Sequence, residues 1–180
     1  MTLTHIRALA EEYVTRYNPK RVAPFPYENI LSDHPNLRVY FTSLDDDQVS
    51  GTILFKDDEF NILINNNKPQ TRQHFTLGHE LGHFFLHQQL LQAEQGIIDG
   101  DETLDGPNIS NILYRSDDEA QKKKRVEIEA NNFAASLLMP ADLVRQAWQV
   151  TQSIEGCARI FQVSAVAMSI RLTHMGLIEE

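Results

Sequence analysis

The 180-residue chain has almost no cysteine and no long apolar run. Its single cysteine, Cys157, has no partner for an internal disulfide, which is typical of proteins from a reducing compartment. No apolar stretch reaches the length of about 18 residues that a membrane-spanning helix needs. The first residues also lack the apolar segment of a secretory signal peptide. We therefore expect a cytoplasmic protein with no membrane partner.

The chain is also poor in positive charge. Its 16 Lys and Arg residues stand against 25 Asp and Glu, and the formal net charge is -9. An acidic chain has no general attraction to nucleic acid or anionic lipid, so either partner would need a local basic patch. The densest run of cations, 122–125, is surrounded by acids and is typical of a solvated first helical turn. Direct nucleic-acid binding is therefore not expected.

The hydrophobic pattern predicts a mixture of helices and strands in one compact domain with a possible appendage. Apolar residues at helical spacing predict helices over 3–17, 27–31, 70–92, 122–138, 141–150, 154–161 and 164–175. Runs of branched and aromatic residues predict strands over 37–42, 50–56 and 60–65, the last two as an antiparallel hairpin. Residues 93–121 show no periodicity, which predicts a long irregular loop.

The helix predicted over 70–92 contains the pattern His79-Glu80-x-x-His83. Two histidines four residues apart on a helix differ by about 40° around its axis, so both rings leave the same face. This spacing lets two ring nitrogens bind one metal ion. Glu80 then lies beside the ion, where it can act as the base for a bound water. We therefore predict His79 and His83 as metal ligands and Glu80 as the catalytic residue.

Two glycines form a second pair four residues apart on the same helix, Gly78 and Gly82. Each costs up to about 1 kcal/mol against alanine in a helix interior. A stripe of two glycines therefore predicts that another backbone packs closely against it. Apolar residues occupy both sides of this helix, which predicts a central, buried position.

A third metal ligand is expected on the helix predicted over 122–138. Catalytic zinc sites commonly use three protein ligands and leave one position open. Glu127 lies about 60° from the centre of the apolar stripe, whereas Glu129 lies about 100° away on the other side. Glu127 is therefore the more inward candidate, and Asn131, one turn beyond it, is placed to hydrogen-bond a ligating histidine. Alternatively, both glutamates are surface charges of an amphipathic helix.

Two separate motifs resemble the paired signature of the ImmA/IrrE metallopeptidases. The first is Phe75-Thr76-Leu77-Gly78-His79-Glu80-Leu81-Gly82-His83, and the second begins at Glu127 and runs through Asn131-Asn132-Phe133-Ala134-Ala135 to Leu137-Leu138-Met139-Pro140. Arg72 and the strand residues before it fit the same pattern, and the resemblance covers about residues 25–140. One departure, Gly78 where many members carry alanine, leaves the ligands untouched.

The resemblance implies an α+β, zincin-like fold, with a small, mostly antiparallel sheet packed on the central motif helix. It also implies an endopeptidase that cleaves a partner protein, usually a helix-turn-helix repressor of the XRE type. Such cleavage releases stress-response or mobile-element genes. The resemblance alone does not decide between Glu127 and Glu129. The E-x-x-A-N arrangement that begins at Glu127 matches the E-x-x-A-D glutamate of other zincins.

We therefore expect His79, His83 and Glu127 to hold Zn2+, or another divalent transition metal such as Mn2+. Glu80 would take the proton of the attacking water and pass it to the leaving amine. A further donor to the oxyanion is expected, and Tyr114, His87 and His174 are candidates that can equally be structural.

The remaining segment, 141–180, is predicted as a helical extension of a metallopeptidase domain over 1–140. Residues 154–172 have the spacing of a helix-turn-helix, which raises a DNA-binding regulator as an alternative. However, 151–180 contains two Arg, no Lys and three Glu, a net charge of -1, so we expect a packing or repressor-docking element. A second alternative is a non-proteolytic repressor-binding or toxin–antitoxin module that retains the metal site.

Overall fold

The computed structural model describes residues 1–46, 48–94, 97–100 and 117–179. Its strands are β1 (Leu37–Thr42), β2 (Val49–Lys56), β3 (Glu59–Asn65) and β4 (Ile97–Gly100). Its helices are α1 (Leu3–Tyr17), α2 (Glu28–Asp33), α3 (Gln70–Leu86), α4 (Gln88–Glu94), α5 (Asp117–Leu138), α6 (Ala141–Thr151), α7 (Ile154–Phe161) and α8 (Ala165–His174). The predicted α+β class with a helical C-terminal region is therefore confirmed.

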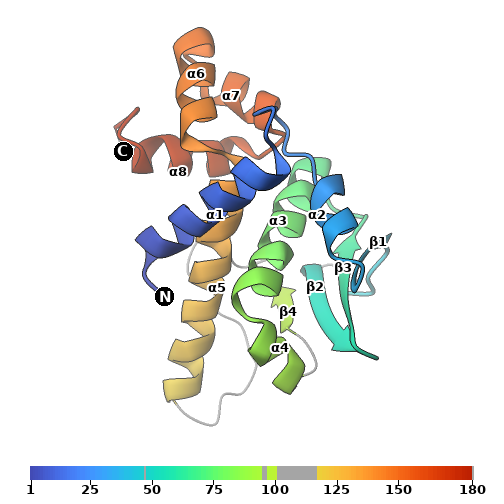
Figure 1. The fold of residues 1–180 in the computed structure, drawn as a ribbon. Coiled ribbons are helices and arrows are strands. Elements are labelled where there is room, and N and C mark those ends of the chain that lie inside the picture. The colour runs from blue at the N-terminus through green and yellow to red at the C-terminus, as the bar shows by residue number, and fades with distance from the viewer. Residues whose placement is uncertain (47, 95–96, 101–116, 180) are drawn as a thin grey trace.

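Helix α3 lies at the centre of the molecule, between the sheet and α5 (Figure 1). It packs on β2 and β3 on one side and on α5 on the other, while α1 packs across α5. Every residue from Phe75 to Phe84 is buried. The predicted central, buried position of the motif helix is confirmed, and its burial follows from apolar side chains on both sides.

The four strands form one sheet in the order β1-β3-β2-β4. Strands β2 and β3 form the predicted antiparallel hairpin, with Ile53 opposite Ile62. Asp57 and Asp58 connect them with φ angles of 54° and 61°. Two left-handed residues in a two-residue connection are typical of the turn that matches strand twist. β1 joins β3 in parallel and β4 joins β2 antiparallel, so the sheet is mostly antiparallel, as predicted.

The prediction of an irregular loop over 93–121 is wrong at both ends of that segment. Residues Ile97–Gly100 form β4, in which Ile98 pairs with Thr52 of β2. Strand β2 supplies the backbone partners, and the short apolar run is too brief to show a period of its own. Helix α5 begins at Asp117 rather than near 122, because Glu, Ala and Gln are good helix formers. Residues 101–116 lie outside the described part of the chain.

The prediction of one helix over 70–92 is also wrong, because α3 ends at Leu86 and α4 begins at Gln88. His87 separates them with φ -128° and ψ 24°. No glycine or proline marks the break in the sequence. The break coincides with contacts of the His87 ring to His83 and Glu129, which a local pattern does not encode.

Close packing against another backbone explains one of the two glycines of α3, Gly82, but not Gly78. A Cβ on Gly82 would lie 3.0 Å from both Cα and O of Ala130, so the α5 backbone does approach here as predicted. A Cβ on Gly78 would instead lie 3.0 Å from a methyl carbon of Leu138, which is a side chain. The backbone prediction is therefore confirmed for Gly82 and wrong for Gly78.

Helices α6, α7 and α8 group at one end of the molecule, at the top of Figure 1. The Ser164 side chain caps α8 by accepting from the Ala167 N–H. Arg171 of α8 is largely buried, and its Nε donates to the Met139 carbonyl at 3.0 Å, which ties α8 to the end of α5. Burial lowers the pKa of Arg171 to about 10, so it stays charged at neutral pH.

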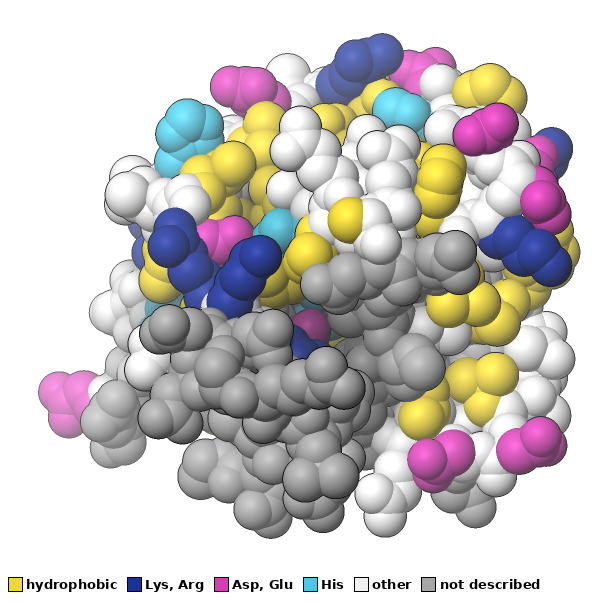
Figure 2. All heavy atoms as spheres, turned by 90° about the horizontal axis from the view of Figure 1, so that it is seen from below, with side chains coloured by type: hydrophobic (Ala, Val, Ile, Leu, Met, Phe, Trp, Pro, Cys, Tyr) yellow, Lys and Arg dark blue, Asp and Glu magenta, His cyan; other side chains and the backbone are white. Residues whose placement is uncertain are grey.

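No helix within the described ranges has the length and apolar character to cross a membrane. On the face shown in Figure 2, Lys and Arg side chains stand among Asp, Glu, His and hydrophobic side chains. The described part of that face therefore carries charges of both signs.

Candidate metal centre

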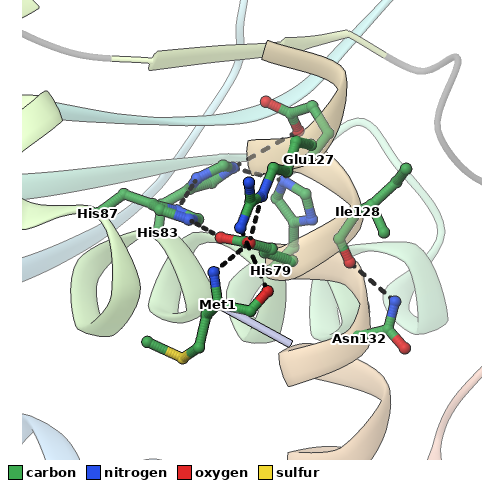
Figure 3. A network of polar contacts seen from close by, with 9 residues as sticks. Met1, His79, His83, His87, Glu127, Ile128 and Asn132 are labelled. Atoms are coloured by element: carbon green, nitrogen blue, oxygen red, sulfur yellow. Dashed lines mark hydrogen bonds and ion pairs between the residues drawn. The ribbon is translucent and has the colours of Figure 1, made fainter. Parts of the chain in front are cut away.

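The two motif histidines project from the buried centre of α3 toward α5 (Figure 3). The side chains of His79 and His83 are 1% and 0% exposed. Because they lie one turn apart on the same face, their Nε2 atoms come within 2.9 Å of each other. The helix thus brings two ring nitrogens to one point inside the protein.

Glu127 reaches the same point from α5. Its Oε2 atom lies 3.1 Å from His79 Nε2 and 3.5 Å from His83 Nε2. Helices α3 and α5 pack closely at Gly82 and Ala130, and this approach brings Glu127 within reach of the α3 histidines. Among the described residues, His79, His83 and Glu127 form a group whose ligand atoms all lie within 4.8 Å of one another.

The geometry of this group fits a small divalent ion. A tetrahedral ion with bonds of about 2.0–2.1 Å holds its ligand atoms about 3.3 Å apart. The three observed separations, 2.9, 3.1 and 3.5 Å, lie around that value. Two imidazoles and a carboxylate are also the donor set of several catalytic zinc sites. The residues that the sequence predicted as ligands are therefore brought together in a suitable arrangement.

The electrostatics of the group favour the protonation states that metal binding needs. Burial lowers the pKa of His83 to about 4, although its contact with Glu127 raises it in part. Burial alone would raise the pKa of Glu127, but the contacts with His79 and His83 outweigh it and hold that pKa well below its usual range. A neutral imidazole facing an ionised carboxylate is the ligand form that binds a cation.

Asn131 lies behind His79, as its position one turn after Glu127 predicted. His79 Nδ1 lies 2.8 Å from Asn131 Oδ1, a hydrogen bond in which the ring nitrogen donates to the amide oxygen. With the proton on Nδ1, the lone pair of His79 sits on Nε2 and points at the shared site. Asn131 therefore orients one histidine of the group.

Glu129, the other glutamate that the sequence offered, lies outside the group. Its Oε2 is 3.1 Å from His87 Nε2, and its Oε1 is 3.0 Å from Arg125 Nε and 3.1 Å from the Met1 ammonium. The side chains of Glu127 and Glu129 are 14% and 11% exposed, so the two do not differ in burial as the helical-face argument expected. What separates them is the histidine that each carboxylate faces.

His87 contacts the back of the site rather than its centre. Its Nδ1 lies 3.1 Å from His83 Nδ1 (Figure 3). Its Nε2 lies 3.1 Å from Glu129 Oε2. Both ring nitrogens are thereby engaged, so the structure gives no support to His87 as a donor to the oxyanion. His174 lies exposed on α8, whereas the site is built from α3 and α5. Tyr114 lies outside the described residues.

Glu80 follows His79 directly on α3 and is 0% exposed. Its side chain leaves the helix about 100° from that of His79. A carboxylate in a buried stretch of helix is costly unless its surroundings compensate it.

The α+β fold and the group of His79, His83 and Glu127 are typical of metallopeptidases. Comparison with known proteins points to the same class. Residues 32–173 match the family described as Peptidase_M78, IrrE N-terminal-like domain. This match covers well over half of the chain, and the chain therefore belongs to the ImmA/IrrE family of metallopeptidases. The match runs past residue 140 and includes most of the C-terminal helices.

Two individual proteins illustrate the relationship. The chain is 26% identical over 141 residues to Metallopeptidase ImmA of Bacillus subtilis (strain 168). The aligned segment covers 77% of this chain and 72% of the relative. In fold it is similar to a solved structure of a Mycobacterium tuberculosis transcriptional regulator, with a TM-score of 0.61 and 17% identity. That similarity covers 94% of this chain but 46% of the solved one, so the chain spans less than half of its length.

Proposed function

We propose that this protein is a zinc-dependent endopeptidase. The observation that carries the proposal is the convergence of His79 Nε2, His83 Nε2 and Glu127 Oε2 at one point, with Glu80 next to His79 on the same helix. Membership of a metallopeptidase family supports the same reading. Another divalent transition metal, such as Mn2+, would also accept two imidazoles and a carboxylate.

The proposed mechanism assigns one task to each residue. Zinc, when bound, lowers the pKa of a coordinated water to about 7 and polarises a carbonyl group. His79, His83 and Glu127 would hold the ion, and Asn131 would keep the His79 lone pair directed at it. Glu80 takes a proton from the water as it attacks the scissile carbonyl carbon. The same carboxyl group then gives that proton to the leaving amine.

We further propose that the substrate is a helix-turn-helix repressor of the XRE type, whose cleavage derepresses stress-response or mobile-element genes. The two sequence motifs at α3 and α5, which resemble those of repressor-cleaving metallopeptidases, support this choice. A cytoplasmic location is proposed with it, and the single buried cysteine, Cys157, is in keeping with a reducing compartment.

The C-terminal helices are proposed to pack on the catalytic part or to dock the repressor, rather than to bind DNA. Residues 151–180 contain two arginines, Arg159 and Arg171. Arg171 is engaged with the Met139 carbonyl, which leaves Arg159 exposed on this segment. One exposed arginine supplies little of the phosphate attraction on which DNA affinity depends. The division into a domain over 1–140 and an extension over 141–180 is likewise retained as a proposal.

Co-expression with a candidate repressor tests the proposal. The protein is produced together with the helix-turn-helix protein encoded beside it, and the repressor is examined for cleavage by mass spectrometry. Wild type should cut the repressor, Glu80→Gln should bind metal but leave the repressor intact, and Glu12→Gln, an exposed glutamate of α1, should behave as wild type. Full cleavage by Glu80→Gln would refute the role of Glu80 as the base. An intact repressor that co-purifies with wild type would favour a non-proteolytic binding module.

A further inference from the structure

Each histidine of the metal centre has a second ring nitrogen, and the two second nitrogens face different partners. His79 Nδ1 is 2.8 Å from the side-chain oxygen of Asn131. His83 Nδ1 is instead 3.1 Å from Nδ1 of another histidine, His87. An imidazole can donate or accept at this distance, so His87 by itself does not fix which nitrogen of His83 carries the proton.

Glu129 resolves this ambiguity. Its Oε2 lies 3.1 Å from His87 Nε2, and a carboxylate can only accept a hydrogen bond. A neutral His87 must therefore carry its proton on Nε2, which leaves Nδ1 as an acceptor. His83 then has to donate from Nδ1, and its lone pair is placed on Nε2, the nitrogen that faces Glu127.

The charge of Glu129 is itself held in place. Its other oxygen, Oε1, accepts from Arg125 Nε at 3.0 Å and from the Met1 ammonium at 3.1 Å. Its side chain is 11% exposed, so these contacts restrict its rotamer. The carboxylate presents a fixed acceptor to His87.

We propose that His87 and Glu129 are positioning residues that fix the tautomer and orientation of His83, the ligand whose Nδ1 faces another histidine and not an oxygen. This inference rests on the proposed metal site. It assigns to Glu129 a role different from that of Glu127, although both glutamates lie on α5 and are covered to similar degrees. Partners of this kind behind a metal-ligating histidine typically change metal affinity about 10–100-fold when they are removed.

Zinc affinity, measured by competition with a chromogenic chelator on the full chain, tests the proposal. His87→Phe keeps a ring but removes the acceptor, and it should weaken zinc binding about 10–100-fold. His87→Gln offers His83 an amide oxygen, as Asn131 offers His79, and should recover most of the affinity. His174→Phe removes an exposed histidine of α8 and should bind zinc as wild type does.

Glu129→Gln is a second test variant, because it keeps the shape of the side chain and removes its charge. It should weaken zinc binding, and in the His87→Phe background it should add almost nothing, since both changes interrupt one chain of contacts. The visible spectrum of the Co2+-loaded protein should keep its band positions in Glu129→Gln. A changed spectrum would make Glu129 a ligand and overturn the proposal.

Two further results separate this inference from the proposed function. If wild type binds zinc and both His87→Phe and Glu129→Gln bind it equally well, the positioning role is refuted while the metal site stands. If wild type binds no zinc, the proposed function fails and the positioning role fails with it. Thermal unfolding of the metal-free variants checks that each one is folded. If His87→Phe does not fold, Glu129→Gln still tests the positioning role.

Discussion

Gly82 of α3 lies directly against the backbone of Ala130 of α5, between the two helices that carry the metal centre. A Cβ atom on Gly82 would lie 3.0 Å from Cα and from the carbonyl oxygen of Ala130. On α5, Glu127 lies three residues before Ala130 and contacts His79 and His83. Asn131 follows Ala130 directly and contacts His79. The absence of a side chain at Gly82 therefore sets the distance across which the site is built.

Gly82→Ala is expected to lower stability and metal affinity together. Forcing an extra methyl group into a packed contact costs about 1–3 kcal/mol. The better helix propensity of alanine offsets up to about 1 kcal/mol of this loss in stability. Because the contact is with backbone, α5 must shift to relieve it, and Glu127 shifts with it. Urea unfolding of the metal-free protein and zinc titration measure the two effects.

Gly78→Ala is the matched control for this change. Its new Cβ would meet a methyl carbon of Leu138 at 3.0 Å, and a side chain can rotate away more easily than a backbone can move. We expect unchanged zinc affinity and a stability equal to or above that of wild type. A loss of zinc binding equal to that of Gly82→Ala would show that helix packing at Ala130 does not control the site.

Glu127→Ala is expected to remove most of the bound metal, whereas Glu129→Ala should retain it with reduced affinity. Glu127 places its carboxylate against the Nε2 atoms of His79 and His83, while Glu129 contacts His87. Loss of a ligand removes a bond to the ion, whereas loss of a positioning partner leaves all three ligands in place. Metal content after dialysis, measured by atomic emission, distinguishes them. The opposite order would move the ligand to Glu129.

The parts of the fold that the sequence predicts well are those fixed by local pattern. Two neighbouring runs of branched and aromatic residues predict the β2–β3 hairpin, and helical periodicity places His79 and His83 on one face. The hydrogen-bonding position of Asn131 follows from the same periodicity, once Glu127 is assumed to face the site. These inferences need the conformation of one element only.

The parts that the sequence does not predict depend on contacts between distant elements. Strand β4 exists because β2 offers it backbone partners, and the helix break at His87 accompanies contacts with His83 and Glu129. The helical face favours Glu127 over Glu129, but the two side chains are covered to similar degrees, so burial does not explain why Glu127 reaches the two histidines. Only the crossing of α3 and α5 decides which carboxylate faces which histidine.

His74 is expected to make the stability of the protein fall as the pH is lowered. Burial lowers the pKa of His74 to about 4 from an ordinary value of 6.5. Between these pH values the unfolded chain binds a proton that the folded chain does not, so stability present above pH 6.5 is lost as the pH falls toward 4. The loss amounts to about 3 kcal/mol for this group when complete.

Replacing His74 isolates that contribution. The difference in unfolding free energy between wild type and His74→Gln, both metal-free, should shrink or reverse between pH 7 and pH 4.5. His5→Gln, which changes an exposed histidine of α1, serves as the matched control for the substitution itself. A pH-independent difference for His74→Gln would mean that His74 takes up its proton as readily in the folded protein as in the unfolded chain.

A fragment that ends after residue 140 is expected to be much less stable than the full chain, although it contains every residue of the proposed site. Val144, Phe161 and Leu172 are buried and belong to the same hydrophobic cluster as Leu138. Each large apolar side chain that loses its burial removes about 1.5–3 kcal/mol. The fragment should therefore show a lower urea midpoint and bind dyes specific for exposed apolar surface. If it instead unfolds at the same midpoint and binds zinc with wild-type affinity, residues 141–180 form a separable extension, and the contact between Arg171 and Met139 adds little to the catalytic part.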